Sequence, residues 1–294
     1  MEDLNSGFKN SRFKVEKQVY QKFENMLISK LNFLVDKATA PDRNGGLLRA
    51  YQLTNKVDGV NRGRQNGFIF YVPAWLTSKI DPVTGFADLL KPRYTSMSEA
   101  RSLFEKLDRI EYDPSEDMFE FDIDLLKFPK TAASARKQWT VCTNSERIET
   151  FINPQKNNEW DNRTVVLTEE FKALFEEYGI DYRKDLKESL LSVDKADFWR
   201  RLVKLFGLTL QMRNSETGNT EVDYLISPVR DANGEFFDSR KQKDGLPKDA
   251  DANGAFNIAR KALWAIDVLK NTADQDLKTA NLSITNAAWL EYVQ

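Results

Sequence analysis

The last predicted helix, over about 252–270, opens with the sequence Asp249-Ala250-Asp251-Ala252-Asn253-Gly254-Ala255. An apolar stripe at helical spacing follows this opening and consists of Phe256, Ala259, Leu263, Ile266 and Leu269. A carboxylate at a helix start commonly caps free backbone N–H groups. It can also point outward while the backbone holds it rigidly, and Gly254 and Ala255 leave room for a phosphate beside it. The residues alone leave both roles open for Asp249 and Asp251.

The composition restricts the chemistry that this chain can perform. Its 294 residues are 41% hydrophobic, 12% aromatic and 30% charged, which is enough apolar material for a sizeable core and a length typical of about two domains. Histidine is absent and Cys142 is the single cysteine. This excludes histidine bases, Ser–His and Cys–His pairs, intrachain disulfides and multi-thiolate zinc sites. An enzyme of this composition would use carboxylates with a hard metal, or Lys, Tyr and Arg.

Three features of the sequence point to the cytoplasm. A lone cysteine fits a reducing compartment. No apolar run approaches the roughly 18 residues of a membrane span. The N-terminal residues 1–5 do not resemble a signal peptide. We therefore expect a cytoplasmic protein with no membrane partner.

Charge is distributed unevenly along the chain. Residues 1–64 contain 12 Lys/Arg against 7 Asp/Glu, whereas residues 103–126 contain 2 Lys/Arg against 9 Asp/Glu. The total is close to neutral, with a formal net charge of −2. A uniformly basic nucleic-acid coat is therefore excluded, while separate basic and acidic surfaces are expected.

The N-terminal part predicts a long amphipathic helix followed by a loop region. Apolar residues recur at helical spacing from Val15 to Leu34, which predicts a helix over about 13–36. A second helix is expected to begin at Leu47. The apolar run 68–72 predicts a buried strand among several glycines, and Pro73 follows it. We place a domain boundary near residue 75.

The middle of the chain predicts a mixture of strands and helices. Alternation around 119–123 predicts a half-exposed strand, and 139–143 and 164–167 are further strand candidates. Thr168 is expected to cap a helix that ends at Gly179 as its C′ residue. Another helix is predicted over about 195–211, and turns are predicted at 233–234 and 244–245.

Two further groups of residues could carry chemistry. Glu2 and Asp3 provide carboxylates, although terminal residues often fray and a disordered acidic terminus is the simpler interpretation. Basic residues near aromatics and glycines suit phosphate contact and base stacking, although a solvated face is the simpler interpretation of each stretch by itself. They are Lys9, Arg12, Lys14, Arg62 and Arg64. Arg213 follows an apolar helix and could simply compensate the helix dipole.

Several stretches, taken together and in order, resemble one family of nucleases. The N-terminal part contains Glu2-Asp3-Leu4-Asn5 and Lys14-Val15-Glu16-Lys17-Gln18-Val19-Tyr20-Gln21-Lys22-Phe23-Glu24. The middle contains Phe70-Tyr71-Val72-Pro73-Ala74, Thr77-Ser78-Lys79-Ile80-Asp81-Pro82-Val83-Thr84-Gly85-Phe86, Leu210-Gln211-Met212-Arg213-Asn214-Ser215 and Ser227-Pro228-Val229-Arg230-Asp231. With the opening of the last helix, these stretches resemble the second RuvC motif, the Nuc domain and the third RuvC motif of the type V-A CRISPR effector nucleases, the Cas twelve-a family.

The resemblance implies an α/β fold in which an RNase H-like RuvC nuclease portion is interrupted by an inserted α+β Nuc domain. RuvC would occupy 1–74 and 248–294, and Nuc would occupy 75–247. By resemblance, Glu2 and Asp251 are catalytic carboxylates that bind Mg²⁺ or Mn²⁺, and Arg213 is a catalytic arginine beside the scissile strand. Asp223 matches another Nuc position, which we assign to the DNA-contacting residues together with Lys9, Arg12, Lys14, Arg62 and Arg64.

The resemblance also implies partners and a limit on activity. The family is bacterial and cleaves DNA after guide RNA pairs with the target strand, so both DNA strands and a guide RNA held by other regions are the expected partners. The family's first RuvC motif supplies a further catalytic Asp, and no segment of this sequence resembles that motif. We therefore expect the catalytic C-terminal portion of an RNA-guided DNA endonuclease, inactive alone. The alternative is a non-catalytic fragment that binds single-stranded nucleic acid or docks onto another part.

Overall fold

The computed structural model describes residues 2–3, 14–31, 48–53, 66–70, 72–128, 131, 134–241, 245–273, 276 and 280–294. The chain divides into two compact units. Unit 1 comprises Met1–Trp75 and Asn257–Trp289, and unit 2 comprises Leu76–Phe256 and Leu290–Gln294. Both α7 (Ala250–Asn271) and α8 (Asn286–Val293) contain a boundary between the units. The division into 1–74, 75–247 and 248–294 stays a prediction from the sequence.

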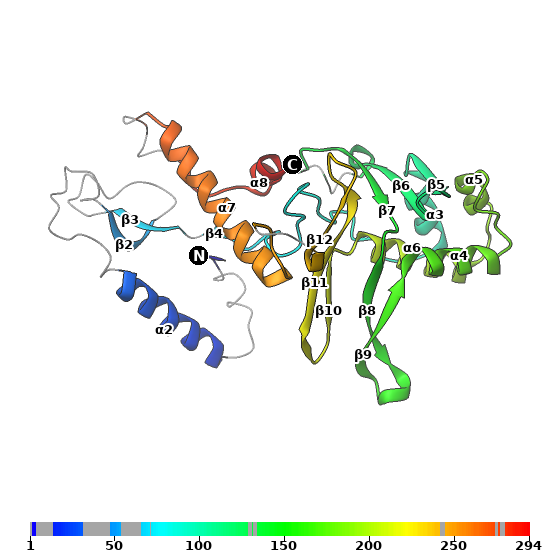
Figure 1. The fold of residues 1–294 in the computed structure, drawn as a ribbon, viewed down its shortest axis with the longest axis horizontal. Coiled ribbons are helices and arrows are strands. Elements are labelled where there is room, and N and C mark those ends of the chain that lie inside the picture. Colours follow the sequence, from blue (N-terminus) through cyan, green and yellow to red (C-terminus); the bar gives the residue numbers. More distant parts are fainter. Residues whose placement is uncertain are drawn as a thin grey trace. The chain divides into compact units, whose positions relative to one another are not determined.

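The described part of unit 1 contains short parallel strand pairs and long helices (Figure 1). Strand β1 (Glu2–Asp3) pairs with β4 (Val72–Pro73), and β2 (Leu48–Leu53) pairs with β3 (Asn66–Phe70). Helix α2 (Lys14–Leu31) and most of α7 complete it. The buried Lys261 on α7 donates through Nζ to the carbonyl oxygens of Pro73 (2.7 Å) and Trp75 (2.5 Å), which fastens the segment after β4 to this helix.

The prediction of a helix beginning at Leu47 is wrong. Leu48–Leu53 forms β2, which pairs with β3, and β3 overlaps the apolar run 68–72 predicted as a strand. Strand formation depends on a paired neighbour more than on local propensity, and the sequence does not show which neighbour is available. The helix predicted over 13–36 is confirmed as α2 over the part of it that the structure describes. On its predicted apolar stripe, Val19, Phe23 and Met26 are exposed.

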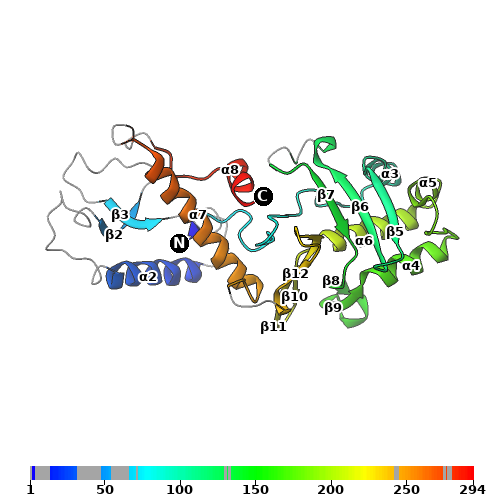
Figure 2. The same cartoon turned by 45° about the horizontal axis from the view of Figure 1, so that its top comes forward.

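Unit 2 is built on a three-stranded antiparallel sheet with helices packed against it (Figures 1 and 2). The strands are β5 (Arg109–Asp113), β6 (Met118–Asp124) and β7 (Gln138–Cys142), in the order β5–β6–β7. The helices that lie wholly in the described part of this unit are α3 (Met97–Glu105), α4 (Leu167–Glu177), α5 (Leu186–Leu191) and α6 (Ala196–Leu210). The strands predicted around 119–123 and 139–143, and the helix predicted over 195–211, are confirmed.

Alternation along β6 decides which face of this sheet is buried. Phe119, Phe121 and Ile123 are fully or almost fully buried, because residues two apart point to the same face of a strand. Phe119 lies 5.5 Å from Phe171 of α4, and Phe121 lies 5.1 Å from Phe206 of α6, measured between ring centroids. These ring contacts join the sheet and both helices in one aromatic core, which gives unit 2 a rigid frame.

Two antiparallel hairpins extend from this core. One consists of β8 (Glu146–Asn153) and β9 (Glu159–Val166), which includes the strand predicted at 164–167. The other begins with β10 (Arg213–Glu216) and β11 (Asn219–Arg230), and β12 (Phe236–Asp238) pairs with the far end of β11. Figures 1 and 2 show that β10 and β8 run side by side. The turn predicted at 233–234 connects β11 to β12, with Gly234 at φ +85°.

The ends of α4 differ partly from the prediction. Thr168 is the second residue of α4 and not its N-cap, which is Val166. The Thr168 hydroxyl instead donates to the carbonyl oxygen of Thr143 (3.0 Å), so tertiary contact replaces local capping. Gly179 follows the C-cap with φ +70°, as predicted for a C′ glycine. Among the described helices, none combines the length and apolarity that crossing a bilayer requires.

Candidate active site

The candidate site is centred on Arg213, the first residue of β10. Helix α6 ends at Leu210, and two residues lead from it into the strand. The Arg213 guanidinium donates hydrogen bonds to carboxylates, not to the carbonyl oxygens that end α6. The interpretation of Arg213 as a simple helix-dipole partner therefore has no support in these contacts.

Arg213 forms a two-point ion pair with Asp223 of β11. Arg213 Nε lies 2.8 Å from Asp223 Oδ1, and Nη2 lies 3.0 Å from Oδ2. In the hairpin register Ser215 is opposite Asp223, so Arg213 and Asp223 occupy diagonal positions on one face. The fork geometry fixes the plane of the guanidinium group. The pair is partly buried, with side-chain exposures of 31% for Arg213 and 16% for Asp223.

Asp251 approaches the same guanidinium group from the start of α7. Asp249 is the capping residue, because its Oδ1 accepts a hydrogen bond from the backbone N–H of Ala252 (2.6 Å). Asp251 is left to contact Arg213 Nη2 through Oδ1 at 3.3 Å, and its side chain is 87% exposed. The sequence left both roles open for these two carboxylates, and the structure assigns one to each.

The start of α7 is held in place within unit 2. The buried Asn253 donates through Nδ2 to the carbonyl oxygen of Ile80 (2.9 Å). A Cβ atom added at Gly254 would lie 3.7 Å from Cβ of Ser78, so the helix and segment 78–80 approach closely. These contacts orient the first turn of α7, which carries Asp251 toward Arg213.

A buried arginine supports the segment that leads to Arg213. Arg147 of β8 is fully buried, and its guanidinium group donates to the carbonyl oxygens of Gln211 (2.8 Å), Asn144 (3.0 Å) and Glu146 (2.9 Å). Burial lowers the pKa of Arg147 to about 10. Sequence reasoning missed this role, because nothing in the pattern of β8 distinguishes a buried arginine from an exposed one.

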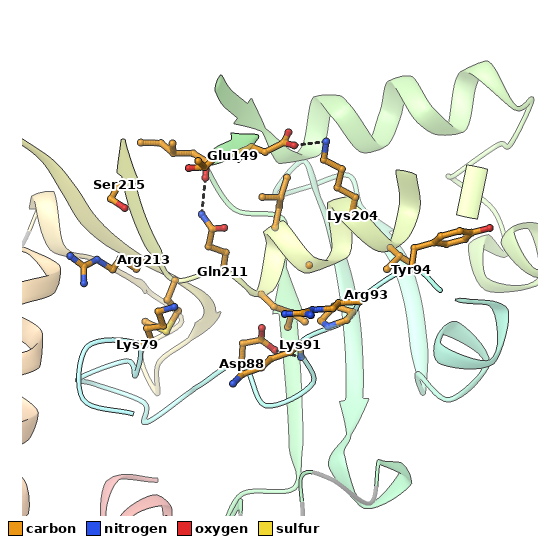
Figure 3. A pocket seen from close by; sticks show the side chains of 18 of the residues that line it. Lys79, Asp88, Lys91, Arg93, Tyr94, Glu149, Lys204, Gln211, Arg213 and Ser215 are labelled. Atoms are coloured by element: carbon orange, nitrogen blue, oxygen red, sulfur yellow. Dashed lines mark hydrogen bonds and ion pairs between the residues drawn. The ribbon is translucent and has the colours of Figure 1, made fainter. Parts of the chain in front are cut away.

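The side chains of Gln211 and Asn214 attach both flanks of Arg213 to β8. Gln211 donates through Nε2 to the carbonyl oxygen of Ile148 (2.9 Å), a bond drawn in Figure 3. The buried Asn214 accepts from the backbone N–H of Ile148 through Oδ1 (2.9 Å). The sequence shows Gln211 and Asn214 only as members of the stretch 210–215. Their role in fixing Arg213 follows only from the structure.

The described residues do not form a metal site by themselves. No group of three or more His, Cys, Asp or Glu side chains suited to a metal ion occurs among them. Asp223 is engaged by Arg213, and the nearest charged partner of Asp251 is that same cation. Glu2 lies on β1 opposite Val72, in unit 1. The described residues by themselves therefore provide no complete set of metal ligands.

The predicted basic contacts fall largely outside the described residues. Lys9, Arg12, Arg62 and Arg64 all lie there, and Lys14 is the first residue of α2.

Cys142 is buried, and burial raises the pKa of its thiol to about 12. A thiol with this pKa stays protonated near neutral pH, so Cys142 is not a nucleophile.

A large part of unit 2 matches a known protein family. Residues 80–241 match the Nuc family, which is described as a nuclease domain. This match covers more than half of the chain, and the chain therefore belongs to the Nuc nuclease-domain family. Membership implies a nucleic-acid substrate and cleavage or binding of nucleic acid. The matched range contains Arg213 and Asp223.

Proposed function

We propose that this chain is the nuclease portion of an RNA-guided DNA endonuclease and that Arg213 contacts the phosphate of the strand being cut. The observation that carries this proposal is the pose of Arg213. Asp223 engages Nε and one Nη2 hydrogen, and Asp251 faces the other. Among the described residues, no acceptor is bonded to Nη1 of Arg213, so a preoriented pair of donors remains for a phosphate oxygen.

The contact between Arg213 and Asp251 fits a site that opens to substrate. Asp251 is 87% exposed, and exposed ion pairs contribute only about 0–1 kcal/mol. A phosphate arriving at Arg213 can therefore replace this contact at low cost, whereas the more buried contact with Asp223 stays in place. Asp223 acts in this proposal as a positioning residue, and Arg213 as the residue that touches the substrate.

The finer parts of the proposal rest on the resemblance to the Cas twelve-a family. They are an RNase H-like RuvC portion around the Nuc domain, guide-RNA pairing as the source of sequence specificity, and Mg²⁺ or Mn²⁺ bound by Glu2 and Asp251. The Nuc family match supports the nuclease part of the proposal, and these finer parts are inferred from the resemblance.

A second candidate function is binding without cleavage. In that case the chain would hold single-stranded nucleic acid or dock onto a further part of the effector. The two functions differ in whether Arg213 affects a rate or only an affinity.

The test is single-turnover cleavage by the complete guide-loaded effector that contains this chain. Arg213→Ala should slow cleavage on the order of 100-fold or more, as expected when a preorganised donor to a reacting oxyanion is removed. Guide-directed DNA binding should stay nearly unchanged, because pairing with the guide supplies specificity. Arg213→Lys should recover only part of the rate, since an ammonium group cannot reproduce the fork.

Arg183→Ala is the matched control, because Arg183 is an exposed arginine of unit 2 stacked on Tyr182 and not part of the site. It should cleave at the wild-type rate. If Arg213→Ala cleaved DNA at the wild-type rate, the assignment of Arg213 to the active site would be wrong. Equal losses of binding and cleavage would favour the binding function.

A further inference from the structure

A basic groove continues from Arg213 across the surface of unit 2 (Figure 3). Its volume is about 910 Å³, and its walls come from the segment 76–94, from α6 between Arg200 and its end, and from the adjoining residues of β8 and β10. Arg213 and Ser215 lie at one end of the view in Figure 3, Lys91 and Arg93 lie near its middle, and Tyr94 lies at the other end. The sequence alone does not predict that these segments lie close together in the fold.

Six cations line this groove, and they are Lys79, Lys91, Arg93, Arg200, Lys204 and Arg213. Two acidic residues, Asp88 and Glu149, line it as well. The lining therefore has a clear excess of positive charge, although the whole chain is slightly acidic. A concave surface lined by one sign of charge concentrates ligands of the opposite sign.

Three of the cations are available for a ligand. Lys79, Lys91 and Arg93 are exposed, and no carboxylate in the described parts of the chain forms an ion pair with any of them. An unpaired side chain can bind a phosphate without first breaking an internal ion pair. This availability distinguishes the three residues from most of the other basic side chains of unit 2.

The two acidic residues offset these cations only in part: neither forms an ion pair with Lys79, Lys91 or Arg93, although the Asp88 carboxylate interacts with the charges of Lys91 and Lys79. Glu149 is already engaged by Lys204 and by Arg163, whose Nε lies 2.7 Å from Glu149 Oε2. Asp88 accepts a hydrogen bond from the backbone N–H of Lys91 (2.9 Å). Burial raises the pKa of the Asp88 carboxyl, which weakens its negative charge near the groove as the pH falls.

The floor of the groove is apolar, and one wall carries an aromatic ring. Ile148, Val203, Leu210 and Met212 are buried side chains that line it. Tyr94 is half-buried, and the Arg200 guanidinium lies 5.5 Å from its ring centroid. A basic rim with an aromatic platform is the usual architecture for single strands, because phosphates meet cations while bases stack on rings.

We propose that this groove binds single-stranded DNA and leads the strand to Arg213. The phosphodiester backbone contacts Lys79, Lys91 and Arg93, and a base stacks against Tyr94. The inference deepens the proposed function, on which its final step, delivery to Arg213, rests. A small anionic ligand would fit the volume, but it could engage only part of a rim that extends from Arg213 to Tyr94.

The first experiment is lysine footprinting of the wild-type full chain with oligothymidylate of about 20 nucleotides. Acetylation at each lysine is measured by mass spectrometry with and without the oligonucleotide. Lys79 and Lys91 should be protected at least about threefold, because bound phosphates shield them. Lys184 and Lys195 are exposed lysines outside the groove lining and should react unchanged.

The second experiment measures the salt dependence of oligothymidylate binding by fluorescence anisotropy. Lys79→Ala combined with Arg93→Ala should lower the slope of log affinity against log salt by about 1.4, which is about 0.7 for each lost phosphate contact. Affinity near 0.1 M salt should fall on the order of tenfold. Arg183→Ala combined with Lys195→Ala removes the same charge elsewhere and should change neither quantity. Equal urea midpoints would verify that all variants fold.

Each outcome decides the proposal. Protection of Lys79 and Lys91 with loss of affinity in the groove variant supports it. Binding with no protection there, or with equal affinity in both variants, overturns the groove and leaves the nuclease proposal to the Arg213 cleavage test. Equal protection by heparin, a polyanion without bases, would show a nonspecific anion patch and would also overturn it. Absence of any binding by the wild-type chain overturns it as well.

Discussion

Arg213 and Asp223 share two hydrogen bonds across the β10–β11 hairpin, at 2.8 Å and 3.0 Å. The pair is partly buried, so it is less screened by solvent than the contact between Arg213 and the exposed Asp251. The two carboxylates around Arg213 therefore differ in role: Asp223 fixes the guanidinium plane, and Asp251 offers a replaceable contact.

This difference predicts a measurable coupling between Arg213 and Asp223. A double-mutant cycle with Arg213→Met and Asp223→Asn should give a coupling free energy of about 1–3 kcal/mol in urea unfolding of the full chain. The control cycle uses Arg163 and Glu170, a more exposed pair at 3.4 Å, and should give about 0.5 kcal/mol or less. Coupling energies that do not differ between the two cycles would contradict a structural role for the Arg213–Asp223 pair.

The buried Arg147 predicts a larger loss of stability. Arg147→Met should lower the free energy of unfolding by roughly 3 kcal/mol, because it leaves three carbonyl oxygens without their donor in a buried place. Arg163→Met removes a half-exposed arginine from β9 and should cost below about 1 kcal/mol. Similar urea midpoints for the two variants would show that the Arg147 contacts do not stabilise the segment before Arg213.

The assignment of different roles to Asp249 and Asp251 can be tested by stability as well. Asp249→Ala should destabilise the chain by about 1 kcal/mol, since it removes the hydrogen bond to the Ala252 backbone N–H. Asp251→Ala should change stability by only about 0.5 kcal/mol, because the side chain is almost fully exposed. A larger loss with Asp251→Ala than with Asp249→Ala in thermal unfolding would reverse the assignment.

The sequence predicts the elements of this fold better than their relationships. Alternation around Phe119 and Phe121 identified β6, because half-buried strands have a period of two. The sequence predicts a helix at Leu48–Leu53, which forms strand β2. The residues of this segment do not show that β3 is available as a pairing partner. Thr168 was predicted as a cap, but its hydroxyl bonds to Thr143, a residue distant in sequence.

For the candidate site as well, the sequence predicts individual residues better than the contacts between them. Arg213, Asp223 and Asp251 were assigned by resemblance to a family, and the structure brings all three together within unit 2. The sequence could not show which of Asp249 and Asp251 caps α7. Lys91-Pro92-Arg93-Tyr94 has the basic and aromatic character sought near the N-terminus, yet its position beside α6 depends on folding of the segment 76–94.

The distribution of buried residues predicts which amides exchange slowest with solvent. Helix α2 exposes Val19, Phe23 and Met26, whereas β6, α4 and α6 share the aromatic core of unit 2. Amides of β6 and α6 should therefore open only with global unfolding, and those of α2 should exchange much faster. Hydrogen exchange measured by mass spectrometry checks this order. Slowest exchange within 14–31 would contradict it.

Acid should lower the folding stability of unit 2, and part of this loss should come from protonation of the Asp238 carboxylate. Burial alone would raise the pKa of this carboxyl, but hydrogen bonds from Arg240 at 2.9 Å and 3.0 Å outweigh burial and lower it. A carboxyl with a lowered pKa in the folded state stabilises that state above its unfolded pKa of about 4, and this contribution is lost as the pH falls through the folded pKa. Between about pH 5 and pH 2, Asp238→Asn should therefore lose less stability than the wild type.

Urea midpoints across this range measure the difference, with Asp185→Asn, a change at an exposed helix cap, as the control. Parallel pH profiles for wild type and Asp238→Asn would show that the Arg240 contact does not couple protonation to folding.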